Sequence, residues 1–231
     1  DITATTQAER DTLTVTLACD TPRATCFCTS VGGGPGDTLG TDVMLYPLGD
    51  GFVARALTSG GETLLALAPG SPAGDKATEA KARVEEARKS MGKPLDLTRV
   101  RDNFDRCFDD LDFWEEQSGK CLSCGACAYL CPTCHCFNIT DEGTEAQGKR
   151  LRSWDNCMSY TFTAEASGHN PRSAKAMRLR NRMGHKFVYF PEAHEDSLAC
   201  CGCGRCIVSC PSSMDIRQVV TAIQEYPDDD K

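Results

Sequence analysis

Two repeated cysteine patterns constrain this 231-residue chain more than any other feature of its sequence. Each pattern has the spacing C-x2-C-x2-C-x3-C and is followed directly by proline. In bacterial proteins that hold two 4Fe-4S clusters on such runs, the fourth cysteine of each run ligates the other cluster. The sequence therefore predicts one cluster on Cys121, Cys124, Cys127 and Cys210, and a second on Cys131, Cys200, Cys203 and Cys206.

Glycines within these runs explain how three thiolates can wrap one cluster. Gly125, Gly202 and Gly204 permit the tight turns that aim backbone amides at the sulfurs. The proline after each fourth cysteine then ends the turn and directs that thiolate toward the other site. Structural zinc is the alternative, although zinc sites normally pair C-x2-C units and do not run three cysteines together.

Eight of the 16 cysteines lie outside the two runs. Cys107 lies on an apolar helical face and is predicted to be a buried thiol, while Cys19 and Cys201 are predicted to be bystanders. His135 and His169 are predicted to be surface or hydrogen-bonded residues. The remaining five thiols are candidates for a third 4Fe-4S cluster, for a zinc site, or for free thiols near a cofactor: Cys26, Cys28, Cys134, Cys136 and Cys157.

Composition and charge limit the partners and the location of the chain. The sequence has no run of about eighteen apolar residues, so we expect no membrane span. The formal net charge is −8, and bound clusters would make it more negative. Such a chain is a poor nucleic-acid binder and suits a basic partner surface. We expect a cytoplasmic protein whose true start lies upstream of Asp1, because the sequence begins with neither methionine nor an apolar leader.

The pattern of apolar and turn residues predicts an α+β fold. Residues 1–70 are predicted to form a β-rich unit. It contains a strand over Asp11–Cys19 with one buried face, and a hairpin between Asp42–Tyr46 and Phe52–Thr58. Residues 71–98 are predicted to be a linker with one surface helix. Residues 99–225 are predicted to form a ferredoxin-like two-cluster domain with a long insert over residues 132–199.

Within the third segment, helical periodicity predicts one amphipathic helix from Val100 to Trp114 and another within Arg172–Lys186. The second helix is rich in arginine and lysine. Its cations are expected to face solvent, to screen the charge of the clusters, or to dock an acidic partner. Phe187–Phe190 is predicted to be a short strand, and the chain from Tyr226 onward is predicted to be disordered.

The sequence around and between the two runs resembles one family. The segments that carry the resemblance are Cys26-Phe27-Cys28 with its glycine-rich continuation, Cys131–Phe137, Ser153–Cys157, His169–Arg172 and His185–Phe187. They are similar to the iron–sulfur beta subunits of sulfhydrogenases and to the corresponding iron–sulfur subunits of anaerobic sulfite reductases. The resemblance implies an electron-transfer subunit of an anaerobic oxidoreductase. Its implied partners are a flavin- and NAD(P)-binding subunit, together with a terminal redox subunit such as a hydrogenase or a sulfite reductase.

Two rival functions stay open at this point. One is substrate chemistry at an open iron of a third cluster, and the other is a zinc-stabilised assembly scaffold. The sequence has no glycine-rich dinucleotide fingerprint between a strand and a helix, so NAD(P) and flavin are expected on a partner. It also shows no convincing nucleophile and base pair. We therefore predict a component of an oxidoreductase complex, with no catalytic residue of its own.

Overall fold

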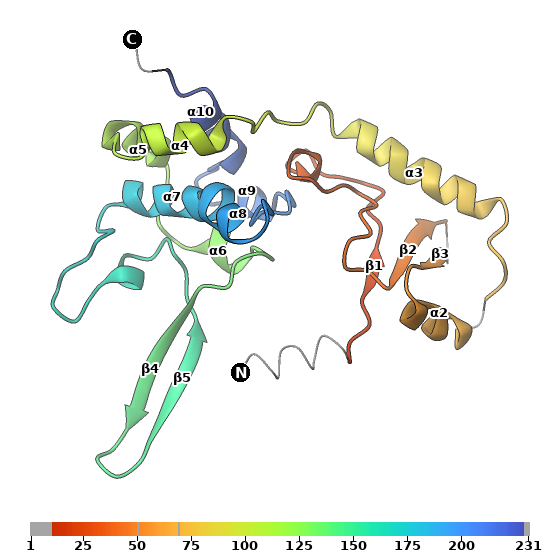
Figure 1. Ribbon diagram of the computed structural model, residues 1–231, viewed down its shortest axis with the longest axis horizontal. Coiled ribbons are helices and arrows are strands. Elements are labelled where there is room, and N and C mark those ends of the chain that lie inside the picture. Colours follow the sequence, from red (N-terminus) through yellow and green to blue (C-terminus); the bar gives the residue numbers. More distant parts are fainter. Residues whose placement is uncertain (1–10, 50, 69, 229–231) are drawn as a thin grey trace. The chain divides into compact units, whose positions relative to one another are not determined.

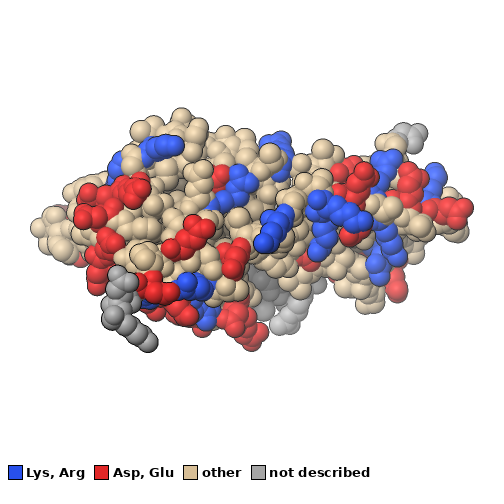
Figure 2. Space-filling view, turned by 90° about the horizontal axis from the view of Figure 1, so that it is seen from above, with Lys and Arg blue, Asp and Glu red and all other residues tan. Residues whose placement is uncertain are grey.

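The computed structural model describes residues 11–49, 51–68 and 70–228 and divides the chain into two compact units (Figure 1). Unit 1 comprises the chain up to Ala24 together with Gly33–Lys93, and unit 2 comprises Thr25–Gly32 and the chain from Pro94. The architecture is α+β, as predicted. Residues 1–3, on which the expectation about the chain start rests, lie outside the described residues. The predicted division at residues 70 and 98 stays a prediction. Acidic and basic side chains are interspersed over the face drawn in Figure 2.

Unit 1 contains a small three-stranded sheet with the order β1-β2-β3. Strand β1 (Val15–Leu17) runs parallel to β2 (Val43–Leu48), and β2 pairs in antiparallel register with β3 (Gly51–Ala56). The predicted hairpin is confirmed. Leu48 pairs with Gly51 across the turn, in which Gly49 adopts a left-handed φ of 61° that glycine tolerates without steric cost.

The first predicted strand is shorter than expected, and its predicted burial is wrong. Only Val15–Leu17 pair with β2, and the alternating apolar side chains of Leu13, Val15 and Leu17 are 46–59% exposed. Strand β1 lies at the edge of the sheet, where Thr16 hydrogen bonds Thr41 through their hydroxyl groups, 2.8 Å apart. An alternating pattern predicts a strand but does not say which face the rest of the fold covers.

Two helices complete unit 1. Helix α2 (Ser59–Ala66) was not predicted; the Thr58 side chain caps its start by accepting a hydrogen bond from the amide of Gly61. Helix α3 (Lys76–Ser90) confirms the predicted surface helix and buries Ala80 and Ala87. The small core of the unit joins Ala80 to Met44, Tyr46 and other side chains of the sheet.

Unit 2 begins with two helices where the sequence predicted one. Helix α4 (Val100–Cys107) ends before Asp110, whose carboxylate accepts a hydrogen bond from the amide of Phe113 and so caps helix α5 (Leu111–Ser118). Val100, Phe104, Cys107 and Trp114 of the predicted apolar face are buried, whereas Leu111 is exposed. Phe104 and Trp114 meet edge to face with ring centroids 5.7 Å apart. Asp110 is thus a helix start that the periodicity concealed.

Helices α7 and α10 pack on the main core of unit 2. Helix α7 (Lys175–Gly184) confirms the predicted basic helix, and it buries Ala176, Leu179 and Met183 as expected. Helix α10 (Ile216–Gln224) packs against α4, where the buried Asn103 side chain donates hydrogen bonds to the carbonyls of Ile223 and Gln224. These helices surround the cysteine runs and fix them to one core.

The predicted strand over Phe187–Phe190 is wrong. Helix α7 continues without a break into a π-helical turn, η3 (His185–Tyr189), and then into α8 (Phe190–Ala193). A short apolar run is compatible with either a strand or a buried helix, and here Phe187 and Val188 are buried in the helical form. Single π-helical turns are rare and are found mostly at functional sites.

The long insert contains an unpredicted antiparallel hairpin of β4 (Phe137–Gly143) and β5 (Gly148–Trp154), seen as two long arrows in Figure 1. It also contains a 3-10 turn, η2 (Tyr160–Thr163). The predicted disorder after Tyr226 is wrong for the first residues of that segment: the Tyr226 hydroxyl donates to Asp110 at 2.8 Å, and Asp228 pairs with Arg106. Residues 229–231 lie outside the described residues.

Candidate metal centre

The two cysteine runs adopt the same local structure. A glycine with left-handed φ, Gly125 at 77° and Gly204 at 69°, precedes a one-turn helix in each run: α6 (Ala126–Tyr129) and α9 (Arg205–Val208). The preceding loops aim amides at sulfur, and the first thiol of each run accepts one such hydrogen bond at 3.4 Å. The sequence-based interpretation of these glycines as turn residues agrees with this geometry.

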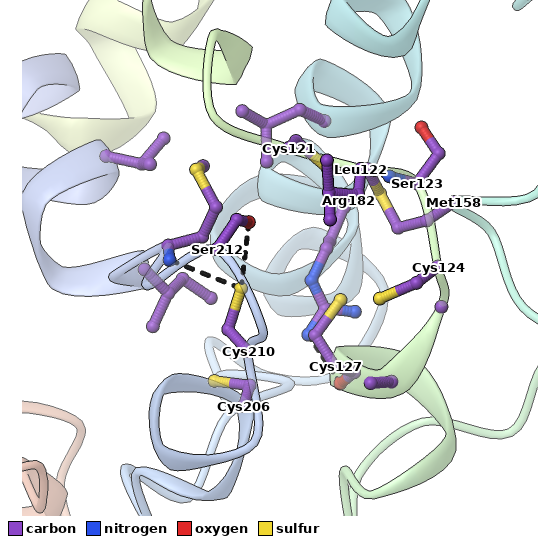
Figure 3. Close-up of a pocket in the computed structure, with 16 residues that line it drawn as sticks. Cys121, Leu122, Ser123, Cys124, Cys127, Met158, Arg182, Cys206, Cys210 and Ser212 are labelled. Atoms are coloured by element: carbon purple, nitrogen blue, oxygen red, sulfur yellow. Dashed lines mark hydrogen bonds between the residues drawn. The ribbon is translucent and has the colours of Figure 1, made fainter.

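The first cavity of the site is lined by thiols from both runs (Figure 3). Cys121, Cys124 and Cys127 come from the first run, and Cys210 and Cys206 come from the second. Figure 3 shows Cys210 on the opposite side of the cavity from Cys121, held by its bonds to the Ser212 hydroxyl and the Met214 amide. The cavity thus brings together the four residues that the crossed pattern predicts for one cluster.

The second cavity has the complementary lining. Cys200, Cys203 and Cys206 meet Cys131 of the first run there, together with Cys201. Phe27, which directly precedes η1 (Cys28–Ser30), also lines this cavity. The backbone amide of Phe27 donates a hydrogen bond to the Gly202 carbonyl at 2.7 Å. Cys206 and Arg182 line both cavities, so the two candidate sites are direct neighbours.

The cavities fit iron–sulfur clusters by the chemistry of their donors. Their metal-ligating side chains are thiols, the soft ligands that such clusters take. Two buried cations, Arg182 and Lys186, lie among these thiols. Buried cations need nearby negative charge, which cysteine thiolates on a cluster supply. In residues 11–49, 51–68 and 70–228, no three His, Cys, Asp or Glu side chains converge on a single metal-ion position.

Three of the five candidate third-cluster thiols lie together. A hydrogen bond with the thiol of Cys136, assisted by the charge of Arg182, lowers the pKa of Cys157 to about 6. Cys134 accepts a hydrogen bond from the Arg182 guanidinium at 3.7 Å and hydrogen bonds Cys131, which lowers the pKa of Cys131 to about 4. The same hydrogen bonds raise the pKa values of Cys134 and Cys136, so one sulfur of each pair keeps its proton while the other favours the thiolate form that binds iron.

Cys26 and Cys28 lie against the second cysteine run. The Cys26 thiol is 3.8 Å from the Cys203 carbonyl oxygen, and a methyl group on Gly202 would lie 2.4 Å from the backbone nitrogen of Cys28. The structure therefore places this segment at the loop of the second run. Of the other three candidates, Cys134 and Cys157 lie beside Arg182, and Cys136 hydrogen bonds Cys157.

The remaining cysteines and the histidines match their predicted environments. Cys107 is fully buried, and burial raises its pKa to about 12. Cys19 and Cys201 are exposed, although Cys201 also lines the second cavity. His135 and His169 are exposed residues.

Sequence reasoning missed the buried cations of the site. The prediction that the basic face of helix α7 and the following turn is fully solvated is wrong, because Arg178, Arg182 and Lys186 are only 5%, 4% and 2% exposed. Thr133 was also missed; its hydroxyl donates to the Ala199 carbonyl at 2.8 Å and contacts the Cys131 sulfur. The signal in the sequence was the spacing of four residues between these three cations, which places them on one face of a helix.

Comparison with known proteins agrees with this geometry. Residues 120–214 match the model of the 4Fe-4S dicluster domain. The chain contains a 4Fe-4S dicluster domain. Its cofactors are thus two 4Fe-4S clusters, as predicted, with Cys121–Cys210 inside the matched range.

The same chain is 32% identical over 210 residues to sulfhydrogenase 2 subunit beta of Pyrococcus furiosus. The match covers 88% of this chain and 61% of that protein, so the chain spans less than two thirds of the relative's length. This confirms the predicted resemblance: the chain is an iron–sulfur protein related to a sulfhydrogenase beta subunit. No solved structure gives a significant match. In the described parts of the chain, no helix has the length and apolar character that crossing a membrane requires.

Proposed function

We propose that this chain relays electrons within an anaerobic, cytoplasmic oxidoreductase complex. The relay connects two other subunits, one that binds flavin and NAD(P) and one that carries the terminal redox centre. The terminal subunit is a hydrogenase, a sulfite reductase or a similar enzyme. The observation that carries the proposal is that two thiol-lined cavities share Cys206 and Arg182. One isolated cluster can serve a structural role, whereas two adjacent clusters form a path for electrons.

The clusters, when bound, supply one-electron carriers, and the chain's own residues hold them. We propose Cys121, Cys124, Cys127 and Cys210 as the ligands of one cluster, and Cys131, Cys200, Cys203 and Cys206 as those of the other. Cavity lining supports this assignment. The amides of Ser123, Gly202 and Met214 orient three of the sulfurs by hydrogen bonds of 3.2–3.4 Å. Such bonds also tune the reduction potential of a bound cluster.

Serine substitutions test the crossed ligands. Under the proposal, anaerobically purified C121S and C210S proteins lose the same cluster and retain the same low-temperature EPR signal after reduction. C131S and C200S lose the other cluster and retain the other signal. Cys19→Ser is the matched control, because Cys19 is exposed and lies in unit 1. If C210S instead matched C200S, each run would hold its own cluster and the crossed assignment would be wrong.

Iron, sulfide and zinc assays test the metal content. A chain with two clusters binds about eight iron atoms, and one with three binds about twelve, by the count of four per cubane. Zinc with little iron would refute the relay and favour the assembly scaffold. Electron transfer is tested with the iron-loaded protein, by mixing it anaerobically with a reduced flavoprotein and following bleaching of its visible absorption.

We propose a third cluster as a second hypothesis for this chain. It is supported by the position of Cys134 and Cys157 beside Arg182 and by the hydrogen bond between Cys157 and Cys136. Cys26 and Cys28 complete the candidate set. Twelve iron atoms in the wild-type protein, falling to eight in C136S, would support it. Eight in both proteins would leave these residues as free thiols. Substrate turnover by the isolated chain would instead favour catalysis at an open cluster.

A further inference from the structure

A row of cations follows one face of helix α7 into the π-helical turn. Arg178, Arg182 and Lys186 are spaced by four residues, and all three are buried. Arg178 donates hydrogen bonds to the carbonyls of Met158, Arg172 and Ser173 and to the Ser123 hydroxyl, and so connects the chain segments that carry these residues. Arg182 and Lys186 reach farther, into the cavities.

Arg182 lies between the two cavities. It lines both of them, donates to the Cys127 carbonyl at 2.9 Å, and donates to the Cys134 sulfur at 3.7 Å. In Figure 3 its side chain extends toward Cys127, beneath the helix that carries it. A charge in this position acts on both cavities at short range.

Lys186 lines the second cavity only. Its ammonium group donates to the Ala199 carbonyl at 2.7 Å and contacts the Cys131 sulfur and the Thr133 hydroxyl, each at 3.3 Å. Among residues 11–49, 51–68 and 70–228, no Asp or Glu pairs with Lys186 or Arg182. The negative charge facing both cations is therefore on sulfur.

We propose that Arg182 and Lys186 are positioning residues that set the reduction potentials of the two clusters, Arg182 acting on both and Lys186 mainly on one. This inference rests on the proposed two-cluster assignment. Each cluster gains one electron from an external reductant such as dithionite, and its negative charge rises by one. A buried cation next to a ligand stabilises this added charge, so it raises the potential. The unequal placement of the two cations makes their effects distinguishable.

The test is a redox titration of the iron-loaded protein, followed by EPR, in wild type and in Lys186→Met and Arg182→Gln variants. We expect K186M to lower one midpoint potential and R182Q to lower both. The K186R variant, which keeps the charge, is expected to restore the wild-type value. Arg180→Gln is the control on the same helix: Arg180 stacks on Phe108, 3.9 Å from the ring centroid, and lines neither cavity.

Iron content is measured first, because it distinguishes failure of the two-cluster assignment from failure of the inference about the two cations. Fewer than about eight iron atoms in the wild-type protein would refute the two-cluster assignment itself. Full iron content in K186M with both potentials unchanged would overturn the inference and leave the assignment intact. If K186M loses iron, the redox titration is repeated with K186Q, because the glutamine amide can still donate a hydrogen bond to the Ala199 carbonyl. Unchanged potentials in K186Q would likewise overturn the inference.

Discussion

Gly202 lies where the backbone of the second cysteine run closely approaches the segment with Cys26 and Cys28. It has a left-handed φ of 63°, and a methyl group there would lie 2.4–2.5 Å from backbone atoms of Phe27 and Cys28. A Gly202→Ala substitution therefore carries two costs. The left-handed conformation of a non-glycine residue costs roughly 1 kcal/mol, and the overlap with backbone adds about 1–3 kcal/mol.

Gly32→Ala separates the two costs. Gly32 also has a left-handed φ, 83°, but nothing lies within 4 Å of its added methyl group. It carries only the conformational cost, so the difference between the variants measures the overlap. That difference of about 1–3 kcal/mol corresponds to roughly 5- to 150-fold in the equilibrium constant for local opening.

Hydrogen exchange of the Phe27 amide is the assay, because this amide donates to the Gly202 carbonyl at 2.7 Å. Mass spectrometry of iron-loaded G202A, G32A and wild-type proteins, matched for iron content, follows it. We expect the Phe27 amide to exchange roughly 5- to 150-fold faster in G202A than in G32A. Equal rates in the two variants would show that the segment does not press on the loop of the second run, and would refute the reasoning.

Other substitutions test the packing around the site. Asn103→Ala removes both side-chain hydrogen bonds to the last carbonyls of α10 and should cost about 2–3 kcal/mol, seen as a lower melting temperature; unchanged exchange in α10 would contradict this. Burial raises the pKa of Cys107 to about 12. Because the unfolded thiol ionises near pH 9 and the folded one does not, wild type should lose about 1.4 kcal/mol per pH unit relative to Cys107→Ala between these values. Urea unfolding of both proteins at pH 8 and 10 measures the difference, and parallel pH profiles would count against it. In unit 1, Gly61→Ala places a methyl group 2.2 Å from the carbonyl oxygen of Asp42 and should destabilise the unit by about 1–3 kcal/mol, whereas Gly51→Ala meets open space. Urea unfolding followed by circular dichroism compares the two, and an equal effect would contradict the predicted contact.

The sequence predicted the parts of the protein that depend on local spacing. The two cysteine runs predicted a dicluster domain, which the family match confirms. The hairpin around Gly49 and the helix at Lys175–Gly184 were also predicted, because turn glycines and helical periodicity are local signals.

The errors arise where contacts distant in sequence decide the outcome. Phe187–Phe190 has the composition of a strand, but the chain continues as a helix that buries Phe187. Arg182 and Lys186 lie on a helix that, read alone, has an ordinary solvated basic face. Their burial depends on thiols about 50 residues earlier in the chain and on the Ala199 carbonyl. Periodicity gives the face of a helix, but not what packs against it.

The division of the chain between its two units has a consequence for synthesis. Thr25–Gly32 belongs to unit 2, although unit 1 surrounds it in the sequence. During translation at about 5–20 residues per second, roughly 10 to 35 s pass after Phe27 is made before Gly202 follows it. Throughout that interval Cys26 and Cys28 belong to a nascent chain that lacks the second cysteine run, whereas all of unit 1 has been synthesised once Lys93 is added. We therefore expect Cys26 and Cys28 to be most accessible to oxygen and to other metal ions during synthesis, before the second cysteine run packs against them.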